Sequence, residues 1–216
     1  GAWVDHIALD ANSRISLSNN DSGTDNTVFG YLAGAALASG GLENTLVGDY
    51  AGTAITTGDY NTAIGKDALK TDDVGQQSTA VGYGALGLQN TASQSAVNNT
   101  GVGVNVAAYN VTGTNNTWLG ANAGVGASGQ SNSNNVGVGS NALLAITTGD
   151  KNIAIGSSAG VAINSGYLNV VIGYQAGDAM TTNAENIAIG YAALGAADSG
   201  EGGNVVFGNE AGNAID

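Results

Sequence analysis

The sequence contains no cysteine and no proline, and both absences narrow the possible folds. Without cysteine the chain has no disulfides and no thiolate metal ligands, so its stability depends on packing in a reducing or an oxidising compartment alike. The absence of proline, together with 43% hydrophobic residues, favours an ordered β structure rather than a disordered chain, despite the 36 glycines.

Positive charge and long apolar runs are also scarce. Four Lys or Arg residues stand against 17 Asp or Glu residues, which gives a net charge of −13. A chain of this charge repels phosphate backbones and anionic lipid headgroups. No run of about 18 apolar residues is present, and the first residues lack the pattern of a signal peptide. We therefore expect neither nucleic acid binding nor membrane insertion.

Residues that carry catalysis are rare as well. His6 is the single histidine, so a Ser-His-Asp arrangement would depend on it. Asp72 and Asp73 are adjacent, and in an extended segment they point to opposite faces. This suits neither the carboxylate pair of a glycosidase nor a calcium-binding loop. We predict a protein that is not an enzyme, with no catalytic residue, no metal site and no cofactor.

What the chain has instead is one short motif that recurs from Asn26 to the C-terminus. It reads Asn, then Thr, Ile or Val, any residue, a large apolar residue, Gly, two variable residues, Ala, and finally Gly or Leu. A period of 17 to 21 residues that persists over eleven repeats is typical of a solenoid or roll. The motif glycines are Gly30, Gly48, Gly65, Gly82, Gly103, Gly120, Gly139, Gly156, Gly173, Gly190 and Gly208.

This period predicts an all-β fold, a parallel β-roll or β-solenoid of about eleven 17-residue rungs over residues 26–216. At about 4.8 Å per rung, the rod would be about 50 Å long. A second apolar position follows the glycine by seven residues, as at Ile55 and Ile146, so we expect two short strands and two turns in each rung.

Two segments depart from the repeat. Residues 1–25 contain two stretches of alternating apolar and polar residues, around Ile7 and Ile15, which predict lead-in or capping strands. The longest spacing separates Gly82 from Gly103, and we place an outward loop there, near residues 87–98.

The first motif position is Asn in ten of the eleven repeats, with Ser78 as the exception. Amides stacked at one corner of a solenoid can hydrogen-bond from rung to rung as a ladder. The predicted ladder consists of Asn26, Asn44, Asn61, Asn99, Asn116, Asn135, Asn152, Asn169, Asn186 and Asn204.

Alternation along each strand assigns the remaining motif positions to two faces. The second and fourth positions face the same side, and the fourth is always apolar, which predicts a buried row. The third position then faces outward, yet it carries no polar residue in eleven rungs, so it needs a cover. We predict that another copy of the chain supplies this cover, over an inter-chain face that includes Val28, Leu46, Trp118, Val171 and Val206.

Four tyrosines, Tyr31, Tyr83, Tyr174 and Tyr191, directly follow a motif glycine and should line one corner. The interpretation that we favour is packing over the neighbouring rung. The alternative is a sugar-stacking stripe, because aromatic faces pack well against sugar rings.

The repeats Asn61-Thr-Ala-Ile-Gly65, Asn152-Ile-Ala-Ile-Gly156 and Asn186-Ile-Ala-Ile-Gly190 resemble the YadA-type head repeats of trimeric autotransporter adhesins. Similar repeats occur in phage tail-fibre and other virion fibre proteins. The resemblance covers residues 26–216 and implies a left-handed, homotrimeric β-roll with an adhesive or receptor-reaching role on a virion or extracellular surface. The longer period and the lack of a neck, coiled coil or anchor favour the phage type.

We therefore expect a structural fibre or appendage protein that acts as stalk or adhesin for host-surface attachment. Its expected partners are further copies of itself and a cell-surface glycan or receptor. Two alternatives stay open at this point: a self-assembling extracellular filament subunit, and a carbohydrate-binding β-solenoid.

Overall fold

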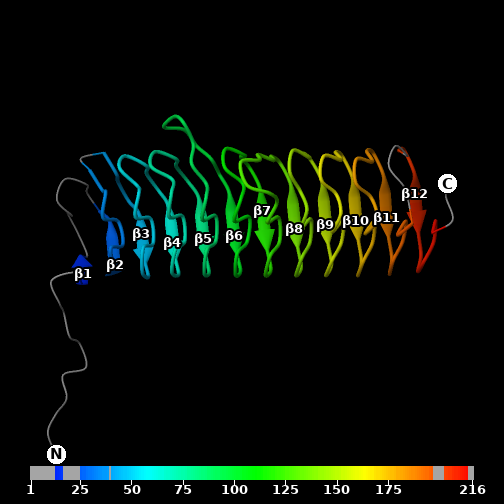
Figure 1. Cartoon of the computed structure of the whole chain (residues 1–216), viewed down its shortest axis with the longest axis horizontal. Coiled ribbons are helices and arrows are strands. Elements are labelled where there is room, and N and C mark those ends of the chain that lie inside the picture. Colours follow the sequence, from blue (N-terminus) through cyan, green and yellow to red (C-terminus); the bar gives the residue numbers. More distant parts are fainter. Residues whose placement is uncertain (1–12, 17–24, 39, 197–201, 214–216) are drawn as a thin grey trace, which may run out of the picture.

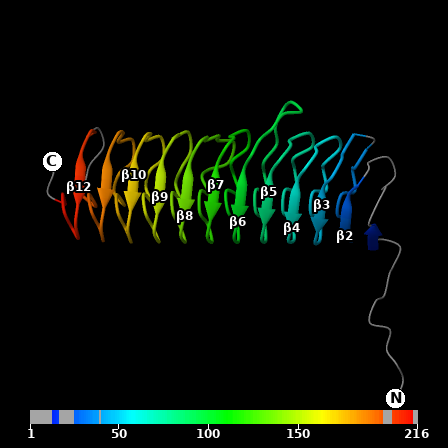
Figure 2. The same cartoon turned by 180° about the vertical axis from the view of Figure 1, so that it is seen from behind.

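The computed structural model describes residues 13–16, 25–38, 40–196 and 202–213. Over these residues the chain forms one sheet, whose strands follow one another in sequence order along a rod (Figure 1). The view from behind shows the same order (Figure 2). The strands are β1 (Ser13–Ser16), β2 (Thr27–Tyr31), β3 (Thr45–Val47), β4 (Thr62–Ile64), β5 (Thr79–Val81), β6 (Thr100–Val102), β7 (Thr117–Leu119), β8 (Val136–Val138), β9 (Ile153–Ile155), β10 (Val170–Ile172), β11 (Ile187–Ile189) and β12 (Val205–Phe207).

The strands β2 to β12 pair in parallel, each with the next, and equivalent motif positions lie opposite each other. The prediction of an all-β parallel solenoid is confirmed. β1 runs antiparallel to β2, so it covers the edge that the first rung would otherwise leave open. The stretch around Ile7 lies outside the described residues.

Each described rung contains one strand, and the expectation of two strands per rung is wrong. The return half of the rung consists of turns, such as those closed by the Ala33 N–H on the Gly30 carbonyl and by the Leu37 N–H on the Gly34 carbonyl. It still bonds to the next rung, since the Gly34 N–H donates to the Ala51 carbonyl at 3.0 Å. Left-handed residues interrupt the extended conformation that a second strand would need.

At least three residues in each rung, besides the motif glycine, have positive φ. In the β4 rung they are Tyr60, Asp67 and Leu69, with φ of 60°, 58° and 49°. Few non-glycine residues adopt this conformation. Its recurrence at equivalent positions in every rung turns the chain through the corners and closes the coil.

The third motif position, which we predicted to face outward, lies inside the coil. Val28, Leu46, Trp118 and Val171 are at most 1% exposed, and Val206 is 7% exposed. All five belong to the chain's own core, where they pack with the motif alanines and with residues such as Met180. The assignment of these five residues to an inter-chain face is therefore wrong.

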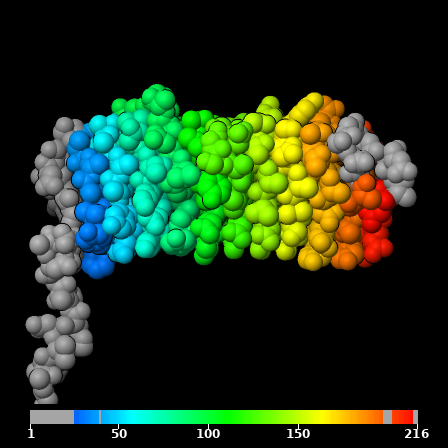
Figure 3. All heavy atoms as spheres, in the orientation of Figure 1, coloured from blue at the N-terminus to red at the C-terminus, as the bar shows by residue number. Residues whose placement is uncertain are grey.

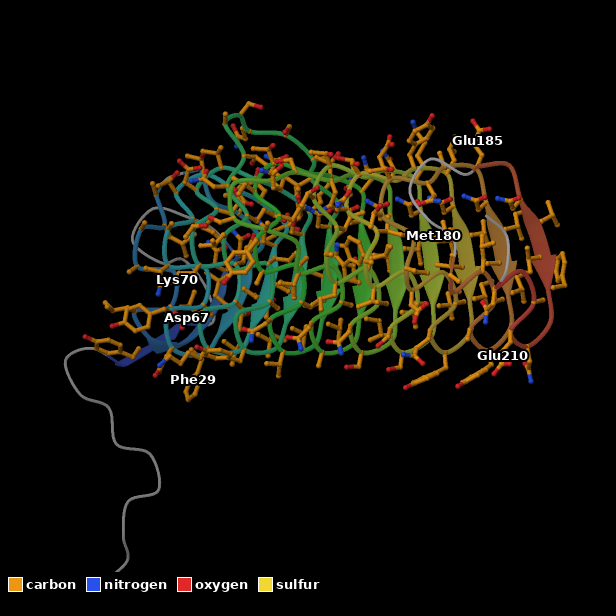
Figure 4. All side chains as sticks on the ribbon, turned by 45° about the vertical axis from the view of Figure 1, so that its right-hand side comes forward. Phe29, Asp67, Lys70, Met180, Glu185 and Glu210 are labelled. Atoms are coloured by element: carbon orange, nitrogen blue, oxygen red, sulfur yellow. The ribbon has the colours of Figure 1, made fainter. Side chains whose placement is uncertain are left out.

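The amide ladder explains this inversion. The first-position Asn side chains are buried, and alternation along a strand then places the third position on the same, inner side. The coil is narrow, so most rungs carry Ala or Gly at that position. Figure 4 shows Met180 within the coil, whereas Phe29 points away from it.

Trp118 shows how tight this interior is. Its indole is fully buried, and the residues that pair with its backbone on either side are Gly101 and Gly137. A Cβ atom on Gly137 would lie 2.5 Å from the Trp118 ring, and one on Gly124 would lie equally close. One large side chain thus requires glycine at two neighbouring positions, Gly124 and Gly137.

The outward loop lies between β5 and β6, where it projects beyond the other rungs (Figure 3). Residues 92–96 are exposed, within the range of 87–98 expected from the spacing. The base of the loop is buried, however, at Gln89, Thr91 and Val97.

Candidate functional site

The outer face of the sheet presents two rows of side chains, from the second and fourth motif positions. The exposed fraction is 66% for Phe207, 53% for Phe29 and 40% for Ile155. We expected the fourth-position row to be buried, and that expectation is wrong for the single chain. No residue of either row is charged. The second-position row is Thr from Thr27 to Thr117 and aliphatic from Val136 onward.

The ladder of Asn side chains runs along the inside of one corner. The Asn152 side chain donates to the Asn135 Oδ1 atom at 3.1 Å and to the Gly166 carbonyl at 2.8 Å. Its own Oδ1 atom accepts from the Asn169 backbone N–H at 3.1 Å and from the Asn169 side chain at 3.0 Å. Nine ladder residues are at most 1% exposed: Asn26, Asn44, Asn61, Asn99, Asn116, Asn135, Asn152, Asn169 and Asn186. Asn204, in the last described rung, is less buried and donates to Asn186.

At Ser78, where the ladder lacks an amide, the side chain of Gln89 takes its place. Gln89 donates to the Ser78 Oγ atom at 3.0 Å and to Asp72, and it accepts from the Asn99 side chain at 2.9 Å. Asp72 is 1% exposed and also accepts from the Gly75 N–H. Gln89 lies seven residues after Gly82, at the position that Ile55 and Ile146 occupy in their rungs, so a regular inward position of the β5 rung supplies the residue that bridges the gap.

Replacing Gln89 by alanine is expected to destabilise the rod by about 3 kcal/mol, because Asp72 and Asn99 lose a buried partner. Adding Ser78→Asn should restore part of this stability, since it returns an amide to the ladder. Chemical denaturation followed by circular dichroism measures both effects. Gln94→Ala on the exposed loop is the matched control, and a Gln89→Ala variant as stable as this control would contradict the bridging role.

The corner tyrosines are about half exposed, and some pack against one another. The rings of Tyr174 and Tyr191 are stacked with centroids 5.8 Å apart, and Tyr31 meets Tyr50 edge-on at 5.4 Å. Tyr83 is 52% exposed and has neither kind of ring contact among the described residues.

A groove of about 370 Å³ lies beside Tyr83, on the outer side of the corner that follows β4 to β7. Tyr83 and Tyr109 flank it, and Asn105 and Asn122 present amides to it. An ion pair stands on one wall, where the Lys70 Nζ atom lies 2.9 Å from the Asp67 Oδ1 atom (Figure 4). The hydrogen bond to Asp67 raises the pKa of Lys70 above its usual value.

The described residues include few other groups that could bind a metal ion or take part in catalysis. Among them, no three His, Cys, Asp or Glu side chains are grouped closely enough to hold a metal ion. None of the described segments is a helix that could span a membrane. His6 lies outside the described residues. Burial raises the pKa of the Asp178 carboxyl, which lies on a corner of the β10 rung.

Comparison with models of protein families, with curated proteins and with solved structures gives no match to this chain.

Proposed function

We propose that this protein is a structural, non-enzymatic component of a fibre or appendage, of the phage tail-fibre or virion-fibre type. In it, three copies associate through the outer faces of their sheets, and the assembly serves as stalk or adhesin at a host surface. The observation that carries the proposal is the long, charge-free outer face of a chain that is otherwise strongly acidic.

The size of this face suits an interface. Eleven rungs with two outward side chains each present 22 residues, within the roughly 20–30 residues per partner of a standard protein interface. An exposed apolar surface of this length is uncommon on a monomer and marks an interaction site. The proposed interface is therefore formed by the second and fourth motif positions, in place of the third-position row that the sequence pattern predicts.

Charge favours a second copy of the chain as the occupant. The carboxylates of the described residues all lie outside the strands, so copies that meet face to face keep these carboxylates apart. The face is Thr-rich toward the N-terminus and aliphatic toward the C-terminus. Parallel copies would place hydroxyl groups against hydroxyl groups and apolar groups against apolar groups.

The number three and the left-handed coil come from the resemblance to trimeric adhesin heads and virion fibres. The shape of the face is compatible with that number, because a strip only two side chains wide can line a central axis shared by several chains. The role at a host surface and the location on a virion or cell exterior come from the same resemblance.

The native mass tests this proposal. Light scattering on protein that has never been heated should give three times the chain mass of 21.0 kDa. A double variant, Ile153→Lys with Ile155→Lys, should give the mass of one chain and keep its β-type circular dichroism. Both side chains are already about 40% exposed in the single chain, so the substitutions cost the coil itself little.

Ser157→Lys, at an exposed corner of the same rung, is the control that adds charge away from the face. A wild-type mass of one chain, or a double variant that stays trimeric, would refute the proposal. A mass that grows with concentration, with fibres in negative stain, would instead support the filament alternative.

A further inference from the structure

We infer that the groove between Tyr83 and Tyr109 is a binding site for a neutral sugar unit of a glycan. This inference goes beyond the fibre role, and it does not depend on how many chains associate. The groove lies at a corner of the coil and includes no residue of the outer sheet face.

The groove exists because one rung lacks two side chains. At the second position after the motif glycine, every other rung carries a side chain, such as Asp67 and Asn105 in the neighbouring rungs, whereas the β5 rung has Gly84. Three residues further on, the same rung has Gly87. The two glycines form the floor, and the side chains of the rungs on either side form the walls.

The walls carry the groups that bind sugars. Tyr83 and Tyr109 are 52% and 41% exposed, so their rings are available to pack against the apolar face of a pyranose. Asn122 donates one hydrogen bond, to Asn141 at 3.2 Å, and retains its Oδ1 atom and a second N–H. Amides provide both donors and acceptors, as adjacent sugar hydroxyls require. Leu88 and Val125 complete an apolar side.

The charge of the groove favours a neutral ligand. Asp67 and Lys70 neutralise each other at 2.9 Å, and no other described residue that lines the groove is charged. The surrounding chain carries a net charge of −13, which disfavours sialylated, sulfated or phosphorylated glycans. The volume of about 370 Å³ lies at the lower end of the range of about 300–1,000 Å³ that is typical of small-molecule sites.

Binding without cleavage is the activity that these groups support. Glycoside hydrolysis generally uses two carboxyl groups on opposite sides of the bond. Within the part of the chain that the structure describes, Asp67 is the one carboxylate that lines the groove, and it is paired with Lys70.

Gly84→Asn is the sharpest variant for a test. The equivalent residues Asn105, Asn122 and Asn141 have φ of 51° to 59°, and Gly84 has φ of 63°, so asparagine suits this backbone conformation. A Cβ atom at Gly84 would meet only the end of the Asn105 side chain, which can rotate away. The variant should therefore fold and fill the groove.

The experiment is an array of neutral and anionic glycans, followed by saturation-transfer NMR with the methyl glycosides of the sugars that bind. We expect neutral glycans to bind, Gly84→Asn to abolish binding, and Tyr83→Ala or Tyr109→Ala to weaken it about tenfold or more. The control Tyr191→Ala, in the stacked pair of the β10 and β11 rungs, should bind like the wild type.

Binding to no glycan on the array, a preference for anionic glycans, or binding that Gly84→Asn leaves unchanged would each overturn the inference. Light scattering of the same preparations reports chain association separately. A monomer that binds sugar would refute only the fibre proposal, and a trimer that binds none would refute only the sugar site.

Discussion

Replacing Gly139 by alanine is expected to destabilise the rod by about 3 kcal/mol or more, because it forces a Cβ atom into the backbone of the next rung. Gly139 has φ of 131°, outside the regions that residues with a Cβ atom adopt. A Cβ atom there would lie 2.5 Å from the carbonyl oxygen of Gly156 in the next rung. Because that contact is with backbone, no rotation of a side chain relieves it.

Thermal and chemical unfolding followed by circular dichroism measure the loss of stability. Hydrogen exchange shows whether the destabilisation extends from the β8 rung to the neighbouring rungs. The latter matters because rungs of a repeat protein are stabilised mainly by adjacent rungs. Gly129→Ala is the control. Gly129 also has positive φ, but a Cβ atom there would meet nothing within 4 Å, so only a backbone cost of about 1–2 kcal/mol is expected. Equal losses at the two sites would contradict the steric argument.

The second large effect is expected for Asn152→Ala, with a loss of about 4 kcal/mol. The substitution removes the partners of the Asn169 backbone N–H and of the Gly166 carbonyl, both inside the coil. Each buried group left without a partner costs about 1–3 kcal/mol. The same unfolding measurements detect the change.

Asn90→Ala is the matched control, because Asn90 has an exposed side chain at the base of the outward loop. Its substitution should change stability by less than about 0.5 kcal/mol. A loss of under 1 kcal/mol for Asn152→Ala would mean that water or a rearranged neighbour replaces the ladder bonds.

Much of the fold could be predicted from the sequence, because its causes recur locally in every rung. The spacing of the motif glycines reveals the parallel solenoid, and the longest spacing locates the outward loop. The recurrence of Asn at the first position indicates where the amides stack. These features depend on residues only a few positions apart and on their repetition, both of which can be read directly from one chain.

The orientation of the strands was the main error, and its cause is physical. Alternation places Thr62 and Ile64 on one face and Ala63 on the other, but it does not say which face is inside. We took the larger apolar residues to be buried, as in a wide core. The narrow coil instead buries Asn and Ala. Two features of the sequence indicate this orientation: the small residues at the third position, and the need to shield the amide ladder from water.

The sequence by itself therefore determined the period, the parallel stacking of the strands and the position of the amide ladder. Only the tertiary structure decided which face is outside and where a groove opens. Gly84 lies between Asp67 and Asn105, which are 17 and 21 residues away along the chain. These residues become neighbours only because the rungs stack. The groove left by the missing side chain at Gly84 can therefore be recognised only from the tertiary structure.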